Sequence, residues 1–178
     1  AAYRTSLQEQ GHLLIVAAKD AIHIDYQWRS LLEAGALPKQ ITVCDVDTEL
    51  FQQLNDYAHE HDIELRNATY DALSDAAASY DDIILLQGNA AIVDALSPKL
   101  ANGGIFACIG NLTDDNAEID LGRLHYDHIF CTGTTSKTWL DAYVPEARVE
   151  LAEGGIALMQ GGAGPMGLMH VQRALEHA

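Results

Sequence analysis

Short apolar runs alternate with longer amphipathic stretches along most of this chain. The runs are rich in Ile, Leu and Val and lie at residues 12–18, 40–46, 82–87, 104–109, 128–131 and 156–160, with a weaker run at 63–67. Runs that are apolar at successive positions are typical of strands in a parallel sheet that helices cover on both faces. The pattern therefore predicts a series of buried strands.

Three amphipathic helices are predicted between these runs, at residues 25–34, 48–59 and 89–100. Trp28, Leu31 and Leu32 share one face of the first helix, Thr48 is the expected cap of the second, and Pro98 makes the last turn of the third irregular. Strands and helices that alternate at this spacing predict an α/β fold with a doubly wound parallel sheet. Right-handed crossovers then bring the carboxyl ends of the strands, and any ligand, to one edge.

The end of the chain repeats its beginning at a shift of 144 residues. Identical residues at this shift include Leu7 and Leu151, Gly11 and Gly155, Leu14 and Leu158, and Arg29 and Arg173. We therefore interpret residues 1–140 as one complete α/β domain. Residues 141–178 are predicted to be a linker and the first strand-helix unit of a second or exchanged domain, so we expect the chain to be a fragment of a longer protein.

A glycine-rich turn follows the last apolar run. Gly162, Gly164 and Gly167 form the pattern GxGxxG between that run and an apolar stretch that reads as a helix. In a Rossmann-type dinucleotide site, these glycines allow the tight turn, the approach of the pyrophosphate and the packing of helix on strand. The N–H groups of the helix N-terminus then bind the anion. A glycine-rich turn without a ligand is the alternative.

The corresponding turn of the first domain lacks all three glycines. Residues 18–23 read AKDAIH, and Asp20 stands where the backbone would approach a phosphate. Its carboxylate would repel the phosphate and its Cβ would crowd it, whereas Lys19 offsets only the charge. The first domain is therefore predicted to be Rossmann-like, with a degenerate phosphate loop.

An acidic residue at the end of the second run is a candidate ligand of the adenosine ribose. Asp45 lies 22 residues after His23, near the separation expected of such an acid. It would favour NAD over NADP, because a carboxylate accepts hydrogen bonds from the ribose and repels a 2′-phosphate. A cap or turn residue is the alternative, and Asp47 is a rival for the ribose role.

Small residues follow the next two strands. Gly88 and Asn89 come after the run at 82–87, and Gly110 comes after the run at 104–109. Such residues leave room for a cofactor that lies across the sheet edge, although plain strand-to-helix turns explain them equally well. We take all three as candidate cofactor-binding residues.

Charge and cysteine content narrow the possible partners. The sequence has 10 Lys and Arg against 26 Asp and Glu, a net charge of −16, which disfavours nucleic acid and anionic membranes as partners. It has no apolar stretch long enough to span a bilayer, and its first residues do not read as a signal peptide. Three widely spaced cysteines, at positions 44, 108 and 131, lie in apolar runs and indicate buried free thiols. We expect a cytoplasmic protein.

The sequence predicts neither a metal centre nor a hydrolase. The pairs His59 and His61, and His125 and His128, have spacings compatible with metal ligands, but no further ligands converge with them. No GxSxG motif or activated nucleophile is recognisable. We assign no catalytic residue and no metal ligand.

Two segments of the chain, residues 40–136 and 150–178, resemble the medium-chain dehydrogenase/reductases, the family of zinc-type alcohol and polyol dehydrogenases. Residues 150–178, ELAEGGIALMQGGAGPMGLMHVQRALEHA, are similar to the start of that family's cofactor domain, especially in the L-sorbose-1-phosphate reductase-like branch. Residues 40–136 follow the same domain in order. By this resemblance, Gly133 lies in the loop after the last strand, near the nicotinamide. The family's catalytic domain and its zinc ligands are absent from this sequence.

The resemblance implies the NAD(P)-binding portion of an oxidoreductase that interconverts a secondary alcohol, such as a polyol or sugar phosphate, and a ketone. NAD is the expected cofactor, and zinc would belong only to the absent catalytic domain. We expect a homo-oligomer, because an isolated strand and helix leave an apolar face exposed. A non-catalytic, degenerate Rossmann module with a role in assembly or regulation is the alternative. An S-adenosylmethionine-dependent methyltransferase, which shares the sheet and the acidic strand end, is a third.

Overall fold

The computed structural model describes residues 4–18, 26–75, 79–112, 116–144, 159 and 162–176. The chain divides into two units, Ala1–Ala147 and Arg148–Ala178, and each is described by itself. The predicted strand at 156–160 and the degenerate turn from Lys19 onward lie outside the described residues, apart from Met159.

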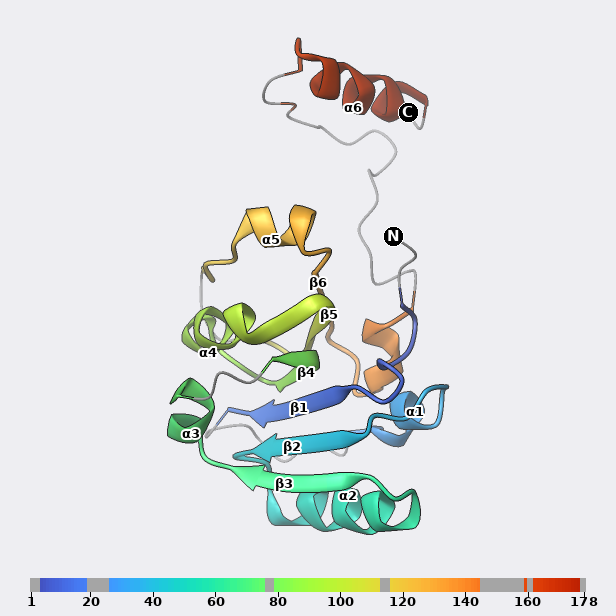
Figure 1. Ribbon diagram of the computed structural model, residues 1–178, viewed down its shortest axis with the longest axis vertical. Helices are drawn as coiled ribbons and strands as arrows, with labels where there is room; N and C mark the ends of the chain where they lie inside the picture. Colours follow the sequence, from blue (N-terminus) through green and yellow to red (C-terminus); the bar gives the residue numbers. More distant parts are fainter. Residues whose placement is uncertain are drawn as a thin grey trace. The chain divides into compact units, whose positions relative to one another are not determined.

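Six parallel strands form the sheet of the first unit, in the order β3-β2-β1-β4-β5-β6. Their bounds are β1 His12–Ala17, β2 Gln40–Cys44, β3 Glu64–Ala68, β4 Tyr80–Leu86, β5 Leu100–Ile109 and β6 Phe130–Thr134. The chain proceeds outward from β1 to β3 and then returns to place β4 beside β1 (Figure 1). This is the strand order of the doubly wound Rossmann fold. The predicted fold class is therefore confirmed.

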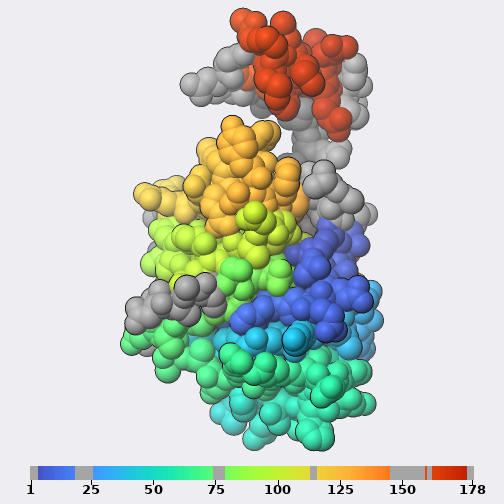
Figure 2. Space-filling model, viewed as in Figure 1, coloured from blue at the N-terminus to red at the C-terminus, as the bar shows by residue number. Residues whose placement is uncertain are grey.

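Burial along the strands follows their positions in the sheet. Five of the six residues of β1 are buried, as its apolar sequence HLLIVA requires of a central strand. The edge strand β3, ELRNA, has no buried residue, which explains its weak apolar signal. In Figure 2 the N-terminal residues, in blue, lie between the green and the yellow-green parts of the chain, in keeping with the place of β1 between β2 and β4.

The helices of the first unit cover both faces of the sheet. Their bounds are α1 Arg29–Leu32, α2 Thr48–Glu60, α3 Tyr70–Asp75, α4 Ala90–Leu96 and α5 Leu121–Tyr126, with 3₁₀ turns η1 Ser97–Lys99 and η2 Trp139–Ala142. Side chains of α1, α2 and η2 belong to one core cluster, and side chains of α3 and α4 belong to the other. Each fully buried Leu or Ile in these clusters contributes about 1.5–3 kcal/mol to stability.

Two helix predictions need correction. The first helix covers only Arg29–Leu32, far less than residues 25–34. The second helix is capped by Asp47, whose carboxylate accepts a hydrogen bond of 2.8 Å from the Leu50 N–H, and Thr48 is its first residue. The irregular turn expected at Pro98 is present as η1.

A single buried carboxylate joins the two ends of the first unit at the amino edge of the sheet, where the strands begin. Asp82 is 2% exposed, and its Oδ2 accepts hydrogen bonds from Arg4 Nη1 at 3.0 Å and from the Gln8 N–H at 2.8 Å. The hydroxyl of Tyr143 donates to Oδ1 at 3.0 Å. Burial raises the pKa of Asp82 to about 6, and Arg4 opposes that rise.

The second unit contains one described helix, α6, which covers Pro165–Glu176. Its apolar side chains Met166, Leu168, Met169 and Leu175 are all more than half exposed. Across the described residues, no helix combines the length and apolar character needed to span a membrane.

Candidate functional site

The carboxyl edge of the sheet, where the parallel strands end, is the candidate site. The strand order reverses between β1 and β4, and there the Ala18 N–H donates a hydrogen bond of 3.1 Å to the Leu86 carbonyl. Beyond this point the chain leaves β1 toward α1 and leaves β4 toward α4. In doubly wound sheets, ligands bind in the crevice at such a reversal.

Three strands end at this edge in a left-handed backbone conformation. The residues that follow β2, β4 and β5 are Asp45, Gln87 and Gly110, with φ of 53°, 48° and 87°. For a non-glycine residue this conformation costs about 1–3 kcal/mol, and such residues cluster at ligand sites. Other non-glycine residues with positive φ lie in turns that precede strands, at Gln10, Asp62 and His128.

Asp45 is exposed at the end of β2, and its carboxylate makes no hydrogen bond or ion pair with the residues described. Asp47 caps α2, so the capping role belongs to Asp47 and not to Asp45. Among the described residues, the Asp45 carboxylate thus makes no contact that would stabilise the fold. Asp45 therefore remains the better candidate for a ligand contact.

Gly88 and Asn89 both have structural roles after β4. A Cβ at Gly88 would lie 2.2 Å from Leu85 Cδ2, so packing excludes a larger side chain. The Asn89 side chain caps α4 by accepting a hydrogen bond of 3.0 Å from the Ile92 N–H. The interpretation as a strand-to-helix turn accounts for both residues.

Gly110 directly follows β5, and Gly133 lies in the neighbouring strand β6. The Gly110 N–H donates to the Thr134 carbonyl at 2.8 Å. Gly133 lies inside β6, one residue before its end, and not in the loop after it as the resemblance implied. A Cβ at Gly133 would lie 3.0 Å from the Cys108 carbonyl oxygen, so close contact between β5 and β6 explains this glycine.

The three motif glycines belong to the second unit. The Gly162 N–H donates to the Met159 carbonyl at 3.3 Å, and a Cβ at Gly162 would lie 3.2 Å from the same oxygen. The Gly164 carbonyl accepts a hydrogen bond of 2.9 Å from Leu168 in the first turn of α6, where Gly167 also lies. This is the tight turn and helix start that the motif predicts.

Sequence reasoning missed two residues at the carboxyl edge, Tyr26 and Gln87. The Tyr26 hydroxyl is buried beside the Gln87 side chain. Burial raises the pKa of Tyr26, and hydrogen bonding with Gln87 opposes the rise. No local signal distinguishes this tyrosine in the sequence, because its neighbours at the site come from distant strands.

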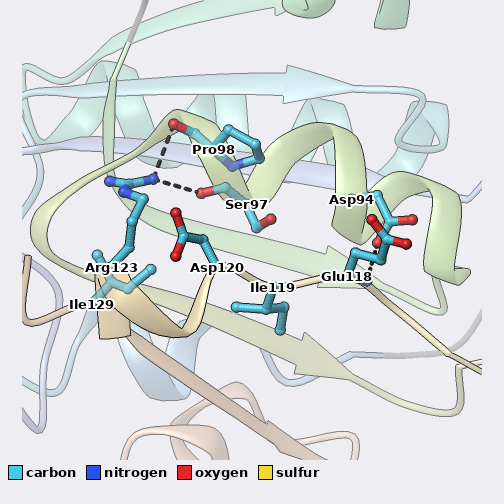
Figure 3. A pocket seen from close by; sticks show the side chains of 8 residues that line it. All are labelled: Asp94, Ser97, Pro98, Glu118, Ile119, Asp120, Arg123 and Ile129. Atoms are coloured by element: carbon cyan, nitrogen blue, oxygen red, sulfur yellow. Dashed lines mark hydrogen bonds between the residues drawn. The ribbon is translucent and has the colours of Figure 1, made fainter. Parts of the chain in front are cut away.

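A separate cavity of about 420 Å³ lies between α4 and α5 (Figure 3). Its lining includes the carboxylates of Asp94, Glu118 and Asp120, which would repel a phosphate. Arg123 in the same lining is occupied, because its guanidinium donates to the carbonyls of Ser97 and Pro98 at 3.1 Å. The cavity adjoins the end of α4 near the amino edge of the sheet, so it is not part of the candidate site.

The described part of the chain contains no cluster of three or more His, Cys, Asp and Glu side chains that could hold a metal ion.

Three solved structures resemble this chain at low sequence identity. The 2R,3R-butanediol dehydrogenase from Bacillus subtilis is 12% identical, with a TM-score of 0.47, over 72% of this chain and 37% of that chain. A cobalt- and zinc-bound alcohol dehydrogenase from Pyrobaculum aerophilum is 16% identical, with a TM-score of 0.49, over 78% and 39%. Acetophenone reductase from Geotrichum candidum, in complex with NAD, is 15% identical, with a TM-score of 0.45, over 72% and 35%.

The chain spans 35–39% of the length of these three proteins. Because their TM-scores lie below 0.5, the fold assignment rests on the strand order and not on these similarities. No protein-family model matches the sequence, and no curated protein sequence matches it either.

Proposed function

We propose that this chain is the NAD-binding portion of an oxidoreductase that interconverts a secondary alcohol and a ketone. The observation that carries the proposal is the Rossmann strand order, with the exposed carboxylate of Asp45 at the end of β2, which makes no hydrogen bond or ion pair with the described residues. In this fold, an acid at that position binds the adenosine ribose and disfavours a 2′-phosphate. NAD is therefore the proposed cofactor in preference to NADP.

The residues at the carboxyl edge suit the two nucleoside halves of the cofactor better than its phosphates. Asp45 serves the adenosine half, and Gly110, which follows β5 at the same edge, is assigned to the nicotinamide half. For the pyrophosphate the described residues offer little, because α1 has four residues and starts 12 positions after Ala17. Gly162, Gly164 and Gly167 of the second unit, which form the GxGxxG turn, remain the proposed phosphate-binding residues.

A bound nicotinamide accepts or donates the hydride, and this chain contributes binding and orientation. The substrate pocket and the catalytic zinc belong, in this proposal, to a domain outside the chain. The resemblance to medium-chain dehydrogenase/reductases, and to their L-sorbose-1-phosphate reductase-like branch, favours a polyol or sugar phosphate as substrate.

Oligomeric state and compartment are further parts of the proposal. The exposed apolar side chains of α6 favour association into a homo-oligomer. All three cysteines are free, which suits the reducing cytoplasm, although the prediction that they are buried is wrong for Cys131, which is exposed.

A non-catalytic module is the second candidate. The lost glycines at residues 18–23 and the short α1 favour it, because both weaken the expected phosphate site. The two functions differ in whether the chain binds NADH.

Titration with NADH tests the proposal. Energy transfer from Trp28 and Trp139 to the reduced nicotinamide reports binding, since Trp139 contacts Tyr26 at the carboxyl edge. We expect saturable binding that is tighter for NADH than for NADPH. Asp45→Asn should weaken NADH binding about 10-fold and reduce the preference over NADPH, since a hydrogen bond to a charged group contributes about 1.5–3 kcal/mol.

The matched control is Asp56→Asn, which removes the same charge from an exposed position on α2. It should leave NADH binding unchanged. Absence of NADH binding at millimolar concentration would refute the cofactor role and favour the non-catalytic module.

A further inference from the structure

The cavity between α4 and α5 carries negative charge that the described residues leave uncompensated. Asp94, Glu118 and Asp120 line it, and none of the three forms an ion pair with a described residue. The guanidinium of Arg123 is paired with Asp127 through Nε at 2.7 Å and donates to two backbone carbonyls of η1. A ligand of this cavity is therefore expected to bring positive charge.

A buried hydroxyl faces the same cavity. Ser97 is 6% exposed and lines the cavity at the start of η1. Its carbonyl accepts a hydrogen bond of 3.1 Å from Arg123, whereas its hydroxyl forms none with a described residue. In Figure 3 the Ser97 side chain is directed into the space between Asp120 and Asp94. Because a buried hydroxyl needs a hydrogen-bond partner, the contents of the cavity supply it.

Local hydrogen bonds fix two of the carboxylates and leave the third free. Asp94 Oδ1 accepts a hydrogen bond from the Glu118 N–H, which ties α4 to the segment before α5. Asp120 Oδ1 caps α5 by accepting a hydrogen bond of 2.8 Å from the Gly122 N–H. The Glu118 carboxylate is exposed and makes no hydrogen bond or ion pair with the described residues. Each of the three carboxylates can thus accept hydrogen bonds from a ligand.

The carboxylates are spread along the cavity and do not meet at one point. Figure 3 shows Asp94 and Glu118 at one end, and Asp120 with Ser97 at the other. Among the described residues, no three His, Cys, Asp or Glu side chains are grouped closely enough to hold a metal ion. The lining also contains apolar surface, which includes the buried Ile129. Separated charges with apolar surface between them fit an organic cation whose ammonium groups are joined by methylene groups.

We propose that the cavity between α4 and α5 binds a linear diamine or polyamine. One ammonium donates hydrogen bonds to Asp94 and Glu118, and a second donates to Asp120 and to the Ser97 hydroxyl oxygen. The methylene chain between them contacts the apolar part of the lining. The cavity volume of about 420 Å³ lies in the range of small-molecule sites. This site is separate from the carboxyl edge and does not depend on the proposed function.

Isothermal titration calorimetry of the full chain with 1,4-diaminobutane tests the proposal. We expect saturable binding of one molecule per chain, about 10-fold tighter than n-butylamine, because the second ammonium adds charge-assisted hydrogen bonds. Magnesium chloride supplies a cation of the same charge as the diamine. It should bind at least about 10-fold more weakly, because the carboxylates do not converge on a single ion.

Two substitutions in the cavity separate a site from general attraction to an acidic protein. Glu118→Gln should weaken diamine binding about 10-fold, since it removes a charged acceptor. Ser97→Ala should weaken it about 2- to 10-fold without changing the net charge. The matched control is Glu60→Gln, which removes the same charge from an exposed position at the end of α2 and should leave the affinity unchanged. Thermal unfolding without ligand should give Glu118→Gln the native melting temperature, because its side chain is exposed.

Three results would overturn the proposal. Equal weakening by Glu118→Gln and Glu60→Gln would show that the diamine binds the acidic surface without a defined site. Magnesium that binds as tightly as the diamine would show that charge alone explains the binding. Absence of diamine binding at millimolar concentration would show that the cavity does not take this class of ligand. None of these results bears on NADH binding at the carboxyl edge, which is measured separately.

Discussion

Asp45 and Asp47 show how two similar residues can differ in role within one turn. Asp47 accepts a hydrogen bond from the Leu50 N–H and caps α2, whereas Asp45 has a left-handed backbone and an exposed carboxylate. The sequence identifies both as candidates, because an acid at the end of the second strand and an acid before a helix look alike. Only the structure shows that the Asp47 carboxylate caps α2 and that the Asp45 carboxylate is exposed, where a ligand could reach it.

This division predicts opposite effects of two alanine substitutions. Asp47→Ala should lower the free energy of unfolding by about 1 kcal/mol, since it removes an N-cap. Asp45→Ala should leave that free energy within about 0.5 kcal/mol of the native value. Urea denaturation followed by circular dichroism measures both. Equal losses of stability in the two variants would contradict the assignment of the cap to Asp47 alone.

At the scale of elements, local pattern accounts for the strands better than for the helices. Strands such as β1 are buried on both faces, and burial imposes a continuous apolar run that is readable in sequence. The predicted helix at 25–34 is reduced to α1 because Gln27 forms a β-bridge with Thr138, so that the helix begins only after this residue. No helical periodicity reports a contact with a residue so far along the chain.

The end of α4 depends on one arginine from α5. Arg123 donates to the carbonyls of Ser97, Pro98 and Leu100, and its Nε donates to Asp127 at 2.7 Å. Arg123→Lys should lower the free energy of unfolding by about 2 kcal/mol, because an ammonium cannot reproduce the planar fork of donors.

The control for this prediction is Arg66→Lys, which alters an exposed ion pair with Glu64. That pair contributes at most about 0.5 kcal/mol. Chemical denaturation of both variants gives the comparison, and a loss at Arg123 no larger than at Arg66 would show that these carbonyls do not need the guanidinium.

At the scale of the whole molecule, the amino edge and the carboxyl edge of the sheet have different tasks. At the amino edge, Asp82 joins Arg4 and Gln8 near one end of the first unit to Tyr143 near its other end. At the carboxyl edge, Tyr26 and Gln87 lie beside Gly110 at the ends of β4 and β5, and Asp45 follows β2. The contacts that join the two ends of the first unit thus lie at the amino edge, and the candidate site lies at the carboxyl edge.

The buried Asp82 carboxyl predicts a dependence of stability on pH. Its pKa is about 6 in the folded chain against 3.8 for the ordinary group, so the folded state binds more protons between these values. The free energy of unfolding should therefore fall as pH rises from about 4 to about 6, by about 3 kcal/mol in total.

Comparison with Asp82→Asn isolates this contribution, because the other carboxyl groups titrate in both proteins. The difference in unfolding free energy between the two should change across this pH interval and be constant above about pH 7. A difference that is independent of pH would show that Asp82 titrates normally in the folded chain.

The sequence by itself determined the α/β class, most of the strands, the glycine turn at Gly162 and the acid at the end of β2. These features follow from burial and backbone conformation within a few residues, which leave a local pattern. The tertiary structure alone decided the strand order, the joining of the chain ends at Asp82 and the place of Tyr26 beside Gly110. Each of these depends on which crossover lies on which side of the sheet, and contacts between residues more than 60 positions apart leave no periodic trace in the chain.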